Sequence, residues 1–247
     1  MPISPNQGST GGGTTVTITG VNLAGATAVN FGTKPATITA NTPTAITVVS
    51  PSGAGEVSVT VTTAGGTSNP LPFFYVGAPF KAAVSATSGP TAGGNTVSIT
   101  GIGLATTTEV AFGANSATPT IVSDGQIDVV VPAGTSAGSV GITVTTAGGS
   151  SNGLSYTYVD APTVSSISPT EGPTSGGTAV TVTGTNLATT QSVTVNGSTA
   201  PFTVVNSSEV SIVTPPGSAG AADVVVTTTG GAATALGGYT YVAGPGI

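Results

Sequence analysis

One pattern occurs three times along the chain, and this internal repeat constrains the fold more than any other feature. The copies begin at Ile3, Val84 and Ile167, and the same succession of short motifs follows each start. A period of about 82 residues is typical of tandem modules that fold as separate units. The sequence therefore predicts three domains, which comprise residues 1–76, 77–159 and 160–247.

The segments within each copy have the pattern of β-strands. They are rich in Val, Ile and Thr, and Gly, Pro or Asn separates them. In residues 57–62 the apolar side chains Val57, Val59 and Val61 alternate with Ser or Thr, which places the valines on one face of a strand. Short alternating strands between turn residues are typical of antiparallel sandwiches, and no segment shows a helical period. We expect an all-β chain with three small cores.

The third copy carries the most complete version of the repeated motif. Residues 167–178 have the pattern Ile-x-Pro-x-x-Gly-Pro-x-x-Gly-Gly-Thr, residues 184–187 have Gly-x-Asn-Leu, and a Tyr-x-Tyr strand closes the copy. The repeat resembles the IPT/TIG family of immunoglobulin-like domains over nearly the whole chain. Departures from the family pattern are Ser9, Gly11, Ala86 and Gly103, and none of them threatens the fold.

The resemblance implies architecture more than activity. IPT/TIG domains occur in cell-surface receptors, bacterial adhesins and surface fibres, carbohydrate-processing enzymes and Rel-type transcription factors, and a fold does not fix a function. Because aromatic residues such as Tyr75, Tyr158 and Tyr241 recur at corresponding places, we expect them in the core or at the sheet edge rather than on a platform for stacking sugars. Short proline-containing linkers, Gly77–Phe80 and Asp160–Pro162, are expected to join the three immunoglobulin-like sandwiches into an elongated rod of roughly 100 Å.

The composition argues against catalysis. The chain has no His, Cys, Trp or Arg, so it lacks the atoms of a Ser–His or Cys–His nucleophile, a His/Cys metal site and a disulfide. Its eight acidic residues are scattered singly, which does not favour a pair of carboxylates for glycoside hydrolysis. We predict no enzymatic activity, no catalytic or metal-binding residues and no cofactor.

Charge also narrows the choice of partner. Two basic residues against eight acidic ones cannot build a surface for nucleic acid or anionic lipid, and no apolar run is long enough to insert into a membrane. Only 4% of the residues are charged, and the mean hydropathy is +0.39. Such a surface offers little repulsion against association, so we expect self-association or protein partners in a larger assembly. A glycan is a further possible partner.

A few residues could serve as local sites. Phe80 and Lys81 stand in a linker and are candidates for an interdomain or partner contact, with interdomain packing of Phe80 the favoured interpretation. The Gly-Gly pairs are interpreted as turns rather than anion cradles. Asp124 and Asp128 only hint at a calcium loop, because further ligands are missing. Asn196 and Asn206 fit a glycosylation pattern but are interpreted first as turn residues.

Three classes of function remain open from the sequence. The leading class is a non-enzymatic structural protein that forms or decorates a surface filament, a layer or a virion-like particle. The second is a cell-surface adhesin or glycan-binding module, and the third is an accessory part of an enzyme. No secretory signal is visible in the first residues. The expected location is extracellular, at the cell surface, or on the exterior of a virion or similar particle.

Overall fold

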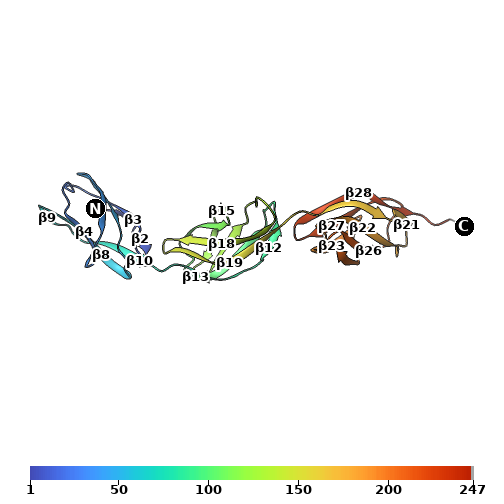
Figure 1. Cartoon of the computed structure of the whole chain (residues 1–247), viewed down its shortest axis with the longest axis horizontal. Helices are drawn as coiled ribbons and strands as arrows, with labels where there is room; N and C mark the ends of the chain where they lie inside the picture. Colours follow the sequence, from blue (N-terminus) through green and yellow to red (C-terminus); the bar gives the residue numbers. More distant parts are fainter. Residues whose placement is uncertain (246–247) are drawn as a thin grey trace. The chain divides into compact units, whose positions relative to one another are not determined.

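The computed structural model describes residues 1–245, apart from the side chain of residue 152. Every regular element among these residues is a β-strand, and the strands of the three repeats follow one another along the chain (Figure 1). Each repeat contains two sheets. The predicted all-β fold with three tandem immunoglobulin-like sandwiches is confirmed.

The first repeat pairs its strands in the orders β1-β3-β7-β6 and β2-β10-β8-β4-β5, with β9 beside β8. Its strands are β1 (Ile3–Ser4), β2 (Gln7–Ser9), β3 (Thr15–Thr19), β4 (Ala28–Phe31), β5 (Lys34–Pro35), β6 (Thr37–Asn41), β7 (Ala45–Val49), β8 (Gly55–Thr63), β9 (Gly66–Thr67) and β10 (Leu71–Val76).

The second repeat has the sheet orders β11-β13-β17-β16 and β12-β19-β18-β14-β15. Its strands are β11 (Phe80–Val84), β12 (Ser88–Pro90), β13 (Thr96–Ile102), β14 (Thr107–Phe112), β15 (Asn115–Ala117), β16 (Thr120–Ser123), β17 (Gln126–Val130), β18 (Gly138–Thr146) and β19 (Gly149–Val159).

The third repeat has the equivalent orders β20-β22-β26-β25 and β21-β28-β27-β23-β24. Its strands are β20 (Thr163–Ser168), β21 (Glu171–Pro173), β22 (Ala179–Thr185), β23 (Thr190–Val195), β24 (Ser198–Ala200), β25 (Phe202–Asn206), β26 (Glu209–Val213), β27 (Gly220–Thr228) and β28 (Gly231–Val242).

One pairing in each repeat departs from the antiparallel pattern expected from the sequence. The short strands β2, β12 and β21 run parallel to the closing strands β10, β19 and β28. In each case the chain leaves the first sheet after one strand and crosses to the second. The short strand therefore lies beside the closing strand in the same direction.

Alternating apolar side chains build the cores. In β27 the buried apolar residues are Ala222, Val224 and Val226, whereas Asp223 between the first two is exposed. The closing aromatics lie where the sequence predicts, because Tyr75, Tyr158 and Tyr241 are at most 8% exposed. Each hydroxyl donates a hydrogen bond to the carbonyl of a proline that lies two residues after the end of β7, β17 or β26, namely Pro51, Pro132 or Pro215.

The Gly-Gly pair of each repeat is a tight turn, as predicted. Gly176 and Gly177 have φ angles of 72° and 86°, which side chains with a Cβ rarely adopt. A Cβ on Gly176 would also lie 2.5 Å from the carbonyl carbon of Pro215. This turn therefore requires glycine for both its conformation and its close approach to the proline loop.

By Cα proximity the chain divides into two compact units. One comprises residues 1–85, 96–129 and 141–154, and the other comprises residues 86–95, 130–140 and 155–247. The first repeat belongs entirely to the first unit and the third repeat entirely to the second. The border between the units passes through the second repeat.

Candidate interaction site

Each closing strand ends at a valine and continues into a segment of the form x-x-Pro, which we call the connector. The three connectors are residues 77–79, 160–162 and 243–245. The first two lead into β11 and β20, and their prolines, Pro79 and Pro162, are buried. Pro245 of the third connector is exposed.

A glycine in the β18–β19 and β27–β28 hairpins receives the connector. A Cβ added to Gly148 would collide with the carbonyl oxygen of Gly77, and one added to Gly230 would collide with that of Asp160. The hairpin is held in the same way in both repeats, because the N–H groups of Gly148 and Gly230 each donate a 3.1 Å hydrogen bond to the hydroxyl of the threonine two residues earlier, Thr146 or Thr228. Only glycine leaves room for the connector backbone at this point.

The Gly-x-Asn-Leu loop forms the other wall of this receiving surface. In the third repeat the side-chain amide of Asn186 donates a hydrogen bond of 2.9 Å to the carbonyl oxygen of Ala161. Asn186 has a φ of 58°, a conformation that asparagine adopts more readily than most residues. In the second repeat Gly103 takes this place, and a Cβ there would lie 3.7 Å from the Pro79 Cα.

The residues after the connector pair with the end of the next strand. Phe80 and Lys81 lie opposite Ile102 and Gly101 in the second repeat. The Phe80 side chain is 66% exposed, and its packing between domains stays a prediction.

Lys81, the other linker candidate, is only 6% exposed, and its amine donates a hydrogen bond to the Ile142 carbonyl. Burial lowers the pKa of this amine. At the equivalent place in the third repeat Val164 lies opposite Gly184 and packs against the core. The structure therefore brings Lys81 into the interior of the second repeat and leaves Phe80 at its surface.

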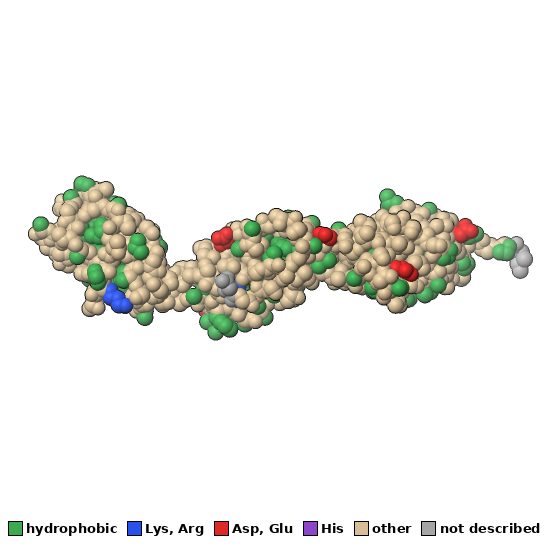
Figure 2. All heavy atoms as spheres, viewed as in Figure 1, with side chains coloured by type: hydrophobic (Ala, Val, Ile, Leu, Met, Phe, Trp, Pro, Cys, Tyr) green, Lys and Arg blue, Asp and Glu red, His purple; other side chains and the backbone are tan. Residues whose placement is uncertain are grey.

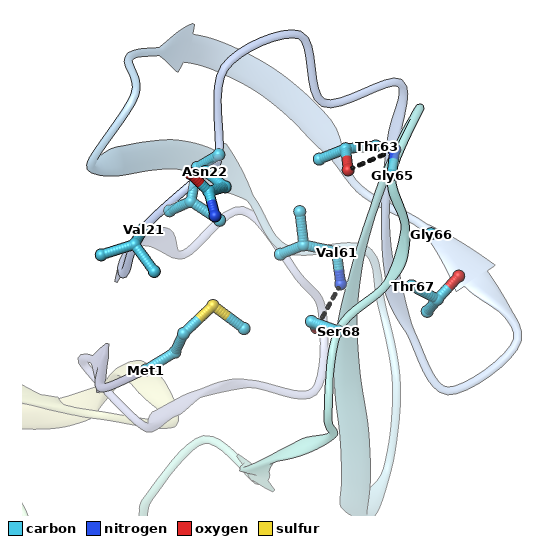
Figure 3. Close-up of a pocket in the computed structure, with 10 residues that line it drawn as sticks. Met1, Val21, Asn22, Val61, Thr63, Gly65, Gly66, Thr67 and Ser68 are labelled. Atoms are coloured by element: carbon cyan, nitrogen blue, oxygen red, sulfur yellow. Dashed lines mark hydrogen bonds between the residues drawn. The ribbon is translucent and has the colours of Figure 1, made fainter.

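In the first repeat the same end of the sandwich contains an open pocket of about 260 Å³ (Figure 3). Met1, Val21 and Asn22 lie on one side of it, and the hairpin that carries Gly65 lies on the other. Its lining consists of Met1, Val21, Asn22, Leu23, Val61, Thr63, Gly65, Gly66, Thr67 and Ser68.

The walls of this pocket match those that hold the connectors elsewhere. Gly65 occupies the hairpin position of Gly148 and Gly230, and its N–H is held by the Thr63 hydroxyl at 3.2 Å. Asn22 has a φ of 57°, close to the 58° of Asn186. A Cβ on Gly65 would find only the Thr63 Oγ1 nearby, at 3.6 Å. The hairpin and the loop that line the pocket thus have the same local form as those that hold the connectors.

The side chains that line the pocket carry no charge. No Asp, Glu, Lys or Arg side chain lines it, and its polar groups are an amide, hydroxyls and backbone. Val21, which borders it, is 76% exposed.

The other candidate residues have structural roles. The Asp124 carboxylate accepts hydrogen bonds from the backbone N–H groups of Gly103 and Ala105, at 3.2 and 3.3 Å. Asn206 accepts from the backbone and hydroxyl of Ser208, both at 2.8 Å, as expected of a turn residue. Among residues 1–245 no group of three or more acidic residues is arranged to hold a metal ion.

The surface carries few exposed aromatic side chains and few charges. Of the aromatic side chains that the structure describes, Phe74 and Phe80 are the exposed ones. The face seen in Figure 2 carries few charged side chains. Within the described part of the chain there is no helix of the length and hydropathy needed to cross a bilayer.

Sequence reasoning identified Gly-x-Asn-Leu as part of the repeated motif, but it missed that this segment and the hairpin glycine hold the connector. The available signal was the joint recurrence of Val-x-x-Pro, Gly-x-Asn-Leu and Thr-Thr-x-Gly-Gly. These three segments are far apart in each copy, and only the structure shows them to be neighbours.

A family model described as the IPT/TIG domain matches residues 1–75, 79–158 and 162–242. No curated protein sequence matches the chain. Among solved structures, the full extracellular region of plexin A4 matches with a TM-score of 0.51 and 21% identity, over 93% of this chain and 22% of that chain. At this identity the match shows a shared fold.

Two other solved structures have lower TM-scores. A Bacteroides ovatus protein, SGBP-B of a mixed-linkage glucan utilization locus in complex with a heptasaccharide, has a TM-score of 0.32 and 19% identity, over 96% of this chain and 65% of that chain. The Escherichia coli adhesin FdeC has a TM-score of 0.34 and 15% identity, over 97% of this chain and 92% of that chain.

Proposed function

This chain belongs to the IPT/TIG domain family, and from that premise we propose that it is a non-enzymatic structural and interaction protein that associates with copies of itself at a surface. The assembly would be a filament or layer, or the exterior of a virion-like particle. The observation that carries this proposal is that large apolar side chains are exposed on a chain with few charges, among them Leu236 at 81% and Phe80 at 66%.

The surface composition supports the same function. With 4% charged residues, neighbouring copies meet little electrostatic repulsion, and short Thr, Ser and Ala side chains lose little entropy when they pack. Phe80 adds an exposed aromatic side chain, which we propose as a contact for a protein partner. An extracellular or surface location is part of this proposal, and the extracellular plexin region offers a precedent for the fold there.

Electron microscopy and analytical sedimentation of the purified chain test the proposal. We expect ordered oligomers, filaments or sheets whose size grows with protein concentration and changes little with salt, because few charges are involved. A single monomeric species at every concentration and salt level would contradict it. Retention on a polysaccharide column without self-association would instead favour the glycan-binding alternative, although the described surface shows no cluster of aromatic side chains for stacking on sugars.

A further inference from the structure

We propose that the third repeat binds a second copy of this chain, and that the Leu236 side chain of each copy fills a hollow in the other. This inference rests on the proposed self-association and assigns one contact to it. The hollow lies between β20 and β28 and has a volume of about 170 Å³. Val164 and Ile167 of β20 line it, together with Ala235 and Gly238 of β28.

The hollow lies beside a position that a leucine takes in the first repeat. There Leu71 pairs with Val59 of β8 and packs against the core. In the third repeat Ala235 pairs with Val224, which is the equivalent of Val59 in the repeated motif, and it also packs against the core. Because the alanine side chain ends at Cβ, the space that a leucine would fill stays open. The occupant that fits this space is therefore a leucine side chain.

The chain exposes a leucine directly beside this hollow. Leu236 follows Ala235, and its side chain is 81% exposed. Pairing of β28 with β27 is interrupted between Ala235 and Tyr239, so the three residues between them form a bulge. The Gly237 N–H donates a 2.7 Å hydrogen bond to the Asp223 carboxylate, and Gly237 has a φ of 58°. The bulge is therefore held before a partner arrives, which lowers the cost of binding.

Leu236 and the hollow lie at an open edge of the sandwich. β27 pairs with β28 from Gly231 to Tyr241, whereas β21, on the other side of β28, pairs only with Thr240–Val242. β20 is the outer strand of its own sheet. Within residues 1–245 no other strand pairs with either edge, and the lining of the hollow contains no charged side chain. A second copy can therefore approach without displacing a strand or burying a charge of the hollow.

The position of Leu236 favours a two-fold pair of copies. Leu236 is a neighbour of Ala235 and Gly238, so one surface patch both provides the leucine and receives it. A self-complementary patch forms a closed pair by a two-fold rotation, in which the same contact occurs twice. Two leucine side chains bury far less area than a standard interface, so we expect a weak pair with a Kd in the millimolar range. A larger assembly needs a second contact, such as the one proposed for Phe80, and would gain from multivalency.

Two substitutions remove opposite halves of the contact. Leu236→Ala removes the inserted side chain. Ala235→Leu fills the hollow from within, with the residue that the first repeat has at this position, so the sandwich can accommodate it. Val205→Ala is the matched control, because Val205 is an apolar residue of β25 in the same repeat and is 54% exposed.

Sedimentation of the full chain near millimolar concentration compares these variants. We expect Leu236→Ala and Ala235→Leu each to lower the association constant by roughly tenfold or more, and Val205→Ala to leave it unchanged. An equal mixture of the two contact variants should associate more strongly than either alone, because the intact Leu236 of one can enter the open hollow of the other. Association that is unchanged in both variants would overturn this contact while leaving the proposed function in place. A monomeric wild type at every concentration would contradict both.

Methyl NMR of the full chain identifies what enters the hollow. The sample mixes copies that carry ¹³C-labelled leucine methyl groups with copies that carry ¹³C-labelled isoleucine methyl groups, so that leucine–isoleucine nuclear Overhauser effects arise only between copies. We expect such an effect between Leu236 and Ile167, stronger at higher concentration and absent in Leu236→Ala. If the effect occurs only within single copies that carry both labels, Leu236 turns into its own hollow, and the contact between copies is overturned.

Discussion

The first and third repeats have the same sandwich but differ at the end where a connector lies. In the third repeat Gly230 and Asn186 hold residues 160–162, whereas in the first repeat Gly65 and Asn22 surround a pocket. The hairpin and the loop have the same conformations in both, so the connector does not create its binding surface. The same residue pair holds a connector in the third repeat and borders an open pocket in the first.

The largest difference in stability between the two repeats is expected when the hairpin glycine is replaced by alanine. Gly230→Ala places a Cβ against the Asp160 carbonyl and should destabilise the third repeat by about 1–3 kcal/mol, as overpacking does. Gly65→Ala should change the first repeat by less than about 0.5 kcal/mol, because the space is open. Hydrogen exchange of the full chain, followed by mass spectrometry, measures protection in each repeat separately.

Gly141→Ala serves as the control for the intrinsic effect of adding a methyl group, because nothing lies within 4 Å of a Cβ added to this exposed glycine of β18. Equal loss of protection for Gly65→Ala and Gly230→Ala would show that the connector does not press on the hairpin. The comparison between the two repeats would then fail.

The second and third repeats differ in the strand that follows the connector. The second repeat buries Lys81 there, and the third repeat has Val164 at the equivalent position. Replacing the buried amine by an apolar side chain of similar length removes a desolvation cost, so Lys81→Met should stabilise the second repeat by about 1 kcal/mol at neutral pH. Val164→Met in the third repeat is the matched control and should change stability little. Denaturation of the full chain, with exchange data to assign the repeat, checks this.

The advantage of Lys81→Met should shrink as the pH rises. Burial lowers the pKa of Lys81 from 10.5, so between the folded and unfolded values the unfolded chain binds more protons. Raising the pH then favours the folded wild type. Tyr75, Tyr158 and Tyr241 have raised pKa values from burial and act in the opposite direction near pH 10, but equally in both proteins. An advantage that does not vary with pH would contradict a buried, titrating amine.

A smaller difference in stability between repeats is expected from the first aromatic residue of each closing pair, which lies in the core. Tyr239 is fully buried and its hydroxyl has no hydrogen-bond partner, whereas the first repeat has Phe73 at this place. Tyr239→Phe should therefore raise the stability of the third repeat by up to about 1 kcal/mol. Tyr156→Phe should lower that of the second repeat by about 1 kcal/mol, because Tyr156 bonds to Asn95 at 3.1 Å.

Both variants keep the edge-to-face ring contact with the next tyrosine, with centroids 5.1 and 5.2 Å apart. The difference between them therefore reports the hydroxyl groups. Thermal unfolding of the two variants beside the wild type measures it. A loss of stability in Tyr239→Phe would indicate that its hydroxyl has a partner in solution.

The fold was predictable from the sequence because the repeat supplies three versions of one pattern. The valines of β8, the turn at Gly176 and the buried Tyr241 all follow from local periodicity and turn chemistry. The receiving surface was not predictable, because it depends on distances between segments that local patterns do not encode. Nothing in the residue types showed that Lys81 would be buried and Phe80 exposed, since each occupies one position of an extended strand whose register sets the facing side.

The smallest difference in stability is expected from the side-chain amide of the loop asparagine, Asn186 in the third repeat and Asn22 in the first. Asn186→Gly keeps the positive φ and adopts the residue found at Gly103 in the second repeat, so it removes the bond to Ala161 without backbone strain. Because this bond is exposed, its loss should cost only about 0.5–1 kcal/mol. Asn22→Gly makes the same backbone change in the first repeat, where no connector lies, and corrects for the flexibility that glycine adds. If exchange at residues 160–162 rises only in Asn186→Gly, the amide holds the connector there. If neither variant alters exchange, the hairpin glycine alone distinguishes the filled end of the sandwich from the open one.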